Sequence, residues 1–177
     1  LFLRHSVATA LWAFLPVYLE YTLGFDRFTI SSIFFINNSL QILTMPLSGH
    51  LSDKIKKKYV ALAGLIGSFI FLFTFTIIKM PIEFLLLQIL VAFSWALLYM
   101  GISSLVTSTS TWNERGEAMA GLSMSINLSS IVGPLVGGII YQLTDFSTMI
   151  YFLLPLCFIA IISSIFLKEK EEIPHNI

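Results

Sequence analysis

The stretch Gly49-His50-Leu51-Ser52-Asp53-Lys54-Ile55-Lys56-Lys57-Lys58 decides how this chain folds. It carries one aspartate and four lysines within six residues, in a chain of which only 11% is charged. A long apolar run precedes it and another follows it. Lysines concentrated between two apolar runs are typical of a short, water-exposed loop between membrane-spanning helices.

Composition indicates the same fold class. The chain is 56% hydrophobic with a mean hydropathy of +0.88, whereas soluble domains are about 25% charged. Its apolar runs reach the ~20 residues that a helix needs to cross a bilayer core of ~30 Å. They lack the period-two alternation of β-strands. We therefore expect an all-α protein embedded in a lipid bilayer.

Six apolar segments predict six transmembrane helices in one domain over residues 1–177. Pro16 interrupts the first segment, and Pro81 suits the first turn of the fourth. Thr111 or Asn113 is expected to cap the fifth helix and Asp145 the sixth. No sequence repeat between the first three and last three spans is obvious, which leaves an inverted structural repeat open. The expected spans are about 3–22, 28–52, 59–78, 82–107, 118–143 and 146–167.

Loop charge predicts the orientation. The positive-inside rule places the Lys54–Lys58 loop in the cytoplasm, so eight basic residues lie on that side and two, Arg27 and Lys79, on the other. With six spans, both termini are then cytoplasmic in a multi-pass protein of the cell membrane. The eight basic residues are Arg4, Lys54, Lys56, Lys57, Lys58, Arg115, Lys168 and Lys170.

Cysteine and histidine are sparse. Cys157 is the single cysteine, which excludes an intrachain disulfide and a cysteine-based metal site. The three histidines lie at segment edges or tails, and no ionisable group is expected at mid-membrane. An intramembrane hydrolase would need such groups beside a nucleophile. We therefore expect no enzyme activity, and no cofactor, metal or nucleic-acid partner.

Two motifs resemble elements of the major facilitator superfamily. Gly49-x-Leu51-Ser52-Asp53-Lys54-x-x-Lys57-Lys58 is similar to the family's loop motif G-x-L-(A/S)-D-(R/K)-x-G-(R/K)-(R/K), which lies between the second and third helices of a six-helix half. Lys56 stands where the family has glycine. Gly133-Pro134-Leu135-Val136-Gly137-Gly138 is similar to the GPxxGG element, although Ser129 stands where drug-antiporter versions often carry glycine.

The resemblance covers the whole chain and implies half of a twelve-helix carrier. Such a carrier is a secondary active transporter, a permease or efflux protein, that moves small molecules by rocker-switch alternating access. The chain begins at Leu1 rather than Met, which suggests a fragment whose partner is the missing six-helix half. The C-terminal half is favoured, because the fourth span lacks an arginine-glutamine-glycine signature. An N-terminal half with degraded motifs, or a six-span unit that dimerises, is the alternative.

The resemblance also implies a gate at the loop motif. Asp53 would dock on the positive N-terminus of a helix in the other half and release as the carrier rocks. A solvated basic loop that only fixes topology is the alternative reading. The gating residues are Gly49, Leu51, Asp53, Lys54, Lys57 and Lys58.

Small residues recur every four positions along the fifth span. They draw a groove where another helix can approach closely, either as a sliding surface between the two halves or as packing within the bundle. This helix-packing motif comprises Gly121, Ser125, Ser129, Gly133 and Gly137, together with Pro134 and Gly138.

Polar and aromatic residues at helical spacing predict a substrate path. Polar groups at membrane depth face the bundle interior or a water-filled cavity, and hydrogen bonding between helices is the alternative role. An uncharged, partly aromatic lining favours a neutral or lipophilic substrate, and any proton-coupling group is expected in the other half. A membrane scaffold or assembly protein that does not transport is the alternative function. The path residues are Trp12, Tyr18, Asn37, Gln41, Gln88 and Trp95.

Overall fold

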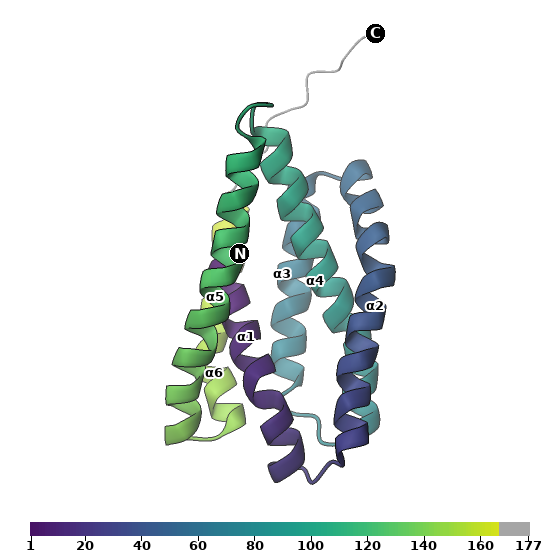
Figure 1. Cartoon of the computed structure of the whole chain (residues 1–177), viewed down its shortest axis with the longest axis vertical. Helices are drawn as coiled ribbons and strands as arrows, with labels where there is room; N and C mark the ends of the chain where they lie inside the picture. Colours follow the sequence, from purple (N-terminus) through teal and green to yellow (C-terminus); the bar gives the residue numbers. More distant parts are fainter. Residues whose placement is uncertain (167–177) are drawn as a thin grey trace.

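The computed structural model describes residues 1–166 and shows an all-helical bundle (Figure 1). All six helices are long and apolar enough to cross a membrane, which confirms the expected fold class. After Pro16, the first helix widens into one π-helical segment, η1, before it ends. The elements are α1 (Phe2–Val17), η1 (Tyr18–Thr22), α2 (Arg27–Lys54), α3 (Lys57–Thr74), α4 (Pro81–Thr109), α5 (Arg115–Leu143) and α6 (Phe146–Ile165).

Carboxylates cap several of the helix N-termini. The expected cap of α6 is confirmed, because Asp145 accepts hydrogen bonds from the backbone nitrogen and the hydroxyl of Thr148 at 3.0 and 2.7 Å. Glu83 accepts two backbone N–H groups ahead of α4, each at 2.9 Å. These bonds satisfy amide groups that the first turn of a helix leaves without an intrahelical partner.

The expected cap of α5 is wrong. Neither Thr111 nor Asn113 caps the helix, because α5 begins at Arg115 with Glu114 at the N-cap position and no side-chain cap bond. Instead the hydroxyl of Thr111 donates to the carboxylate of Glu114 at 2.7 Å. This contact closes the turn before the helix rather than its first turn.

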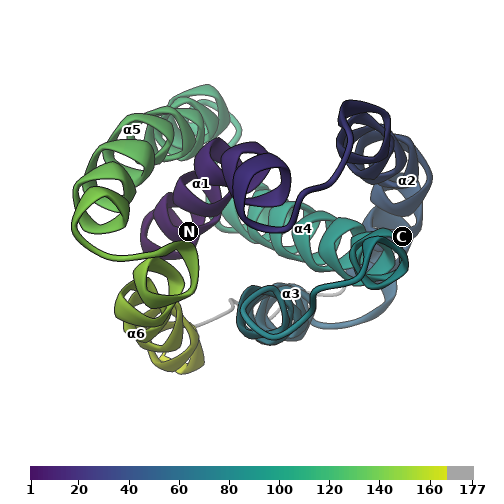
Figure 2. The ribbon, with the colours of Figure 1, turned by 90° about the horizontal axis from the view of Figure 1, so that it is seen from below.

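The six helices form an inverted repeat. α1 packs on α5, α2 packs on α4, and α3 packs on α6, so exchanging α1–α3 with α4–α6 reproduces the same contacts. Consecutive helices run in opposite directions (Figure 1), which makes the two triplets antiparallel. Seen along the bundle, α1 and α4 lie between α2 and α5 (Figure 2).

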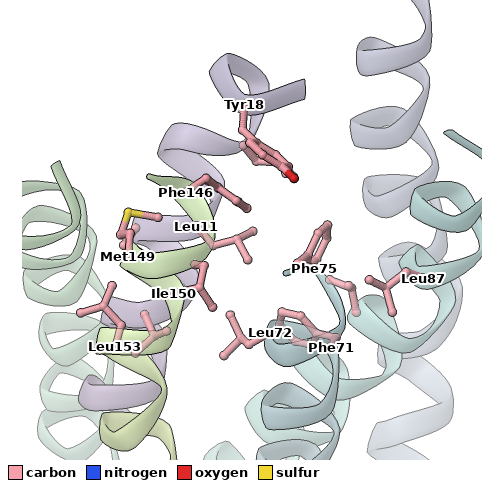
Figure 3. Close-up of a cluster of buried hydrophobic side chains, with 14 of the residues drawn as sticks. Leu11, Tyr18, Phe71, Leu72, Phe75, Leu87, Phe146, Met149, Ile150 and Leu153 are labelled. Carbon is pink, nitrogen blue, oxygen red and sulfur yellow. The ribbon is translucent and has the colours of Figure 1, made fainter. Parts of the chain in front are cut away.

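An aromatic core holds one end of the bundle together. Phe71 of α3 and Phe75, which directly follows α3, meet residues of α1, α4 and α6, all of them buried (Figure 3). The ring of Tyr18 stacks on that of Phe146 with centroids 4.3 Å apart. Nearer the N-terminus of α3, this helix and α4 touch almost backbone to backbone, because a Cβ on Gly64 would overlap the backbone of Leu98. Small residues allow such close contacts where lipid removes the usual hydrophobic drive between helices.

Candidate functional site

The loop motif is mostly helix. Gly49 to Lys54 form the last turns of α2, and only Ile55 and Lys56 connect it to α3. Lys56 has φ −52° and ψ 122°, a conformation open to any residue, so its replacement of the family glycine strains nothing. Asp53 is exposed at this end of the bundle. The ammonium group of Lys58 donates to the carbonyl oxygen of Ile165, near the C-terminus of α6.

The small-residue motif of α5 does not face one neighbour along its length. Gly133 and Gly137 are buried against α1, where a Cβ on Gly137 would lie 2.7 Å from that of Ala10. The hydroxyl of Thr9 in α1 donates to the carbonyl oxygen of Ser129 at 3.0 Å. Gly121 has nothing within 4 Å of an added Cβ. From Ser129 to Gly137 the motif is therefore packing within this six-helix unit.

Arg4 is not a loop charge. Its side chain is only 2% exposed, and its Nε donates to the hydroxyl of Ser68 at 2.8 Å. Ser68 lies in the middle of α3, and the N-terminus of the chain lies at about mid-height of the bundle (Figure 1). Counting Arg4 among the cytoplasmic basic residues was therefore wrong, as was the expectation of no ionisable group at mid-membrane.

His5 also lies inside the bundle rather than at a segment edge. Its ring stacks on Trp95 of α4, with centroids 4.9 Å apart. The guanidinium group of Arg4 lies over the same indole, 5.2 Å from its centroid. Trp95 therefore lies in contact with both basic side chains of α1.

These side chains line a cavity of about 220 Å³ between α1, α2 and α4. Four of the expected path residues, Trp12, Asn37, Gln41 and Trp95, lie on its wall. The structure adds Arg4, His5, Ala8 and Val91 to the lining.

A chain of amides forms one side of this cavity. The Gln41 side chain donates to the Asn37 oxygen at 2.7 Å, and the Asn37 nitrogen donates to the Gln88 oxygen at 3.0 Å. Gln88 donates in turn to the carbonyl oxygen of Phe84 at 2.9 Å. Gln88 is fully buried behind Asn37 and does not line the cavity. Its position is that of a helix-to-helix hydrogen bond, the alternative considered from the sequence.

Tyr18 lies apart from the other expected path residues. It contributes to a separate hollow near the α5–α6 turn, beside Lys79, Tyr141 and Asp145. Its ring, in η1, stacks on that of Phe146. Tyr18 and Trp12 therefore do not line one cavity.

Six helices of membrane-spanning length, arranged as an inverted repeat beside a cavity lined by both polar and apolar side chains, define a helical membrane protein of the inverted-repeat class. The family model of the Major Facilitator Superfamily matches residues 1–177, and the chain belongs to that family. The match confirms the resemblance carried by the two motifs. Its six apolar helices and its family together indicate an integral multi-pass membrane protein.

Two curated relatives are transport or resistance proteins. The chain is 27% identical over 140 residues to the "Staphyloferrin B transporter" of Staphylococcus aureus (strain NCTC 8325 / PS 47), covering 76% of this chain and 32% of that protein. It is 24% identical over 136 residues to "Multidrug resistance protein 1" of Bacillus subtilis (strain 168), covering 77% of this chain and 35% of that protein. The chain therefore spans about a third of the length of these relatives.

Proposed function

We propose that this chain forms one half of a secondary active carrier that moves a small molecule by rocker-switch alternating access. The observation that carries the proposal is the cavity between α1, α2 and α4, lined by both polar and apolar side chains, at mid-height of an inverted repeat. Carriers of this architecture bind substrate near the bilayer midplane, at the interface between repeats. The indoles of Trp12 and Trp95 in the wall support a substrate with an apolar body.

A second six-helix unit completes the carrier in this proposal. α2 and α5 flank α1 and α4 (Figure 2), and both expose large apolar side chains such as Phe35, Ile42, Ile131 and Leu135. The second unit is the other half of the same carrier. This chain is the C-terminal half of that carrier. An N-terminal half, or a six-span unit that dimerises, would use the same two helices.

Asp53 forms the cytoplasmic gate described above, here called the latch: a contact that holds the two halves together on the cytoplasmic side and releases during transport. Its exposure at the end of α2 leaves the carboxylate available to the N-terminus of a helix in the other half. The lysines of Lys54–Lys58 and Arg115 share that end of the bundle, whereas Arg27 and Lys79 lie at the other. This asymmetry supports a cytoplasmic position for the loop in the cell membrane. The N-terminus lies at about mid-height of the bundle and does not share that end, and the expected cytoplasmic C-terminus lies outside the described residues.

Flux through proteoliposomes tests this proposal. The complete protein that contains this chain is reconstituted, and uptake of ethidium, 5-carboxyfluorescein and N-phenyl-1-naphthylamine is compared with empty liposomes. Protein-dependent flux of any one of them is the expected result. If none is carried, in either direction and with or without a proton gradient, the chain is better explained as a membrane scaffold.

The latch is tested in the same liposomes. Asp53→Asn should slow flux about fivefold, the rate equivalent of ~1 kcal/mol of helix-terminus interaction, while membrane insertion stays intact. Glu117→Gln, an exposed carboxylate at the same end of the bundle, is the matched control and should retain wild-type flux. If the Asp53→Asn variant transports at the wild-type rate, Asp53 is not the latch.

A further inference from the structure

The buried guanidinium group of Arg4 lacks an anionic partner in the part of the chain that the structure describes. Its Nε donates to Ser68, and its face lies 5.5 and 5.2 Å from the ring centroids of Phe71 and Trp95. None of these groups carries a negative charge. Arginine stays protonated in proteins, so burial does not neutralise it.

The carboxylates of residues 1–166 all lie away from Arg4. They occupy loops and helix ends, and the one ion pair recorded among these residues joins Arg27 to Glu20 at 3.2 Å. A buried charge without a counter-charge is strongly unfavourable, and cation–π contacts offset only part of that cost. The carboxylates are Glu20, Asp26, Asp53, Glu83, Glu114, Glu117 and Asp145.

The cavity offers the place for that counter-charge. Arg4 contributes to its wall together with two indoles, those of Trp12 and Trp95. Asn37 and Gln41 add amide groups on the α2 side. The Nδ1 atom of His5 is buried without a hydrogen-bond partner at the same wall. Cationic, aromatic and amide surfaces thus surround one space of about 220 Å³.

We propose that this cavity binds an organic anion, with its carboxylate or similar oxyanion paired to Arg4 and its apolar body against Trp12 and Trp95. The inference rests on the proposed transport function and specifies its substrate class. It replaces the neutral substrate favoured from the sequence, because the premise of an uncharged lining does not hold once Arg4 and His5 belong to the wall.

A pair of probes that differ only in charge tests the proposal. The complete protein is purified in lipid nanodiscs, and binding of 1-naphthoate and 1-naphthamide is measured by titration calorimetry at pH 7.5. Wild-type protein should bind the acid at least about tenfold more tightly than the amide, because a charge-assisted hydrogen bond replaces a neutral one. Arg4→Gln should abolish this preference.

Two further variants keep the test decisive. Arg4→Lys retains the charge without the planar fork and should keep a reduced preference for the acid, even if Arg4→Gln does not fold. Arg27→Gln removes an exposed arginine outside the cavity and should bind both probes as the wild type does.

Three results would overturn the anion site. Equal wild-type affinities would mean that a carboxylate outside the described residues compensates Arg4. A preference that survives Arg4→Gln would place the anion elsewhere, and binding of neither probe would remove the ligand site altogether. Each of these results leaves the flux measurement standing, so loss of the anion site and loss of the transport function are told apart.

Discussion

The contact between α5 and α1 gives a stability prediction with an internal control. Gly133 faces α1 so closely that an added Cβ would overlap the carbonyl oxygen of Ser6 and the hydroxyl of Thr9. A Cβ added to Gly121, in the same helix and the same small-residue motif, would have no such neighbouring atom within 4 Å. Replacing each glycine by alanine therefore makes the same chemical change in two different surroundings.

The expected free energies follow from these contacts. In a helix interior alanine is favoured over glycine by about 1 kcal/mol, and both variants gain this. Gly133→Ala also forces the α1 backbone away, since one of the overlapping atoms is a main-chain oxygen, and overpacking of this kind costs about 1–3 kcal/mol. The propensity gain cancels in the comparison, so Gly133→Ala should be less stable than Gly121→Ala by about 1–3 kcal/mol.

Thermal unfolding measures the difference. Both variants of the complete protein are heated in the same detergent, and the folded fraction is followed by fluorescence-detected size exclusion. At ~2–4 °C per kcal/mol for a unit of this size, Gly133→Ala should melt roughly 2–12 °C below Gly121→Ala. Equal melting temperatures would refute the assignment of the motif to fixed α1–α5 packing, and would favour a surface that separates during transport.

Two other predictions concern hydrogen bonds. Asn37→Ala should destabilise the protein by about 1–3 kcal/mol, because it leaves the buried Gln88 oxygen without its donor. Adding Gln88→Leu to Asn37→Ala should recover part of the lost stability in a melting assay. No recovery would mean that the loss does not come from the hydrogen bond between these two side chains. Hydrogen bonds from Thr148 lower the pKa of Asp145 below its usual 3.8. The α6 cap should therefore stabilise the fold fully above that value and be lost as pH falls through the lowered pKa, a dependence of melting temperature that Asp145→Asn should remove.

Helices could be read from the sequence because their signals are local. Each apolar run is long enough to cross a bilayer by itself, and the charges or turn residues beside it mark where it ends. Asp145 could be recognised as a cap because its partner, Thr148, is three residues away. The α5 cap failed for the same reason, since Thr111 and Glu114 are three residues apart and can bond to each other ahead of the helix.

The lining of the cavity could be predicted only partly from the sequence, because it depends on which helices pack together. Arg4 precedes a run of apolar residues, which is where a cytoplasmic flanking charge is also found. Only in the folded bundle does its long side chain reach Ser68 of α3 and Trp95 of α4.

The small-residue motif shows why spacing alone does not identify a neighbour. An α-helix has 3.6 residues per turn, so a four-residue spacing drifts by about 40° at each step. From Gly121 to Gly137 the drift amounts to roughly 160°, and the two glycines face different directions. The structure accordingly leaves Gly121 open and buries Gly137 against Ala10.

The inverted repeat is visible in the sequence once the helix register is known. Pro46-Leu47-Ser48-Gly49 in α2 and Pro134-Leu135-Val136-Gly137 in α5 both begin 19 residues after the first residue of their helix. A Cβ on Gly49 would lie 3.1 Å from a methyl group of α4, and one on Gly137 would lie 2.7 Å from Ala10 of α1. α2–α4 and α5–α1 are the two contacts that the repeat exchanges. Gly49 of the loop motif and Gly137 of the GPxxGG element therefore make equivalent close helix contacts in the two triplets. These contacts lie toward opposite ends of the bundle because the two triplets are antiparallel.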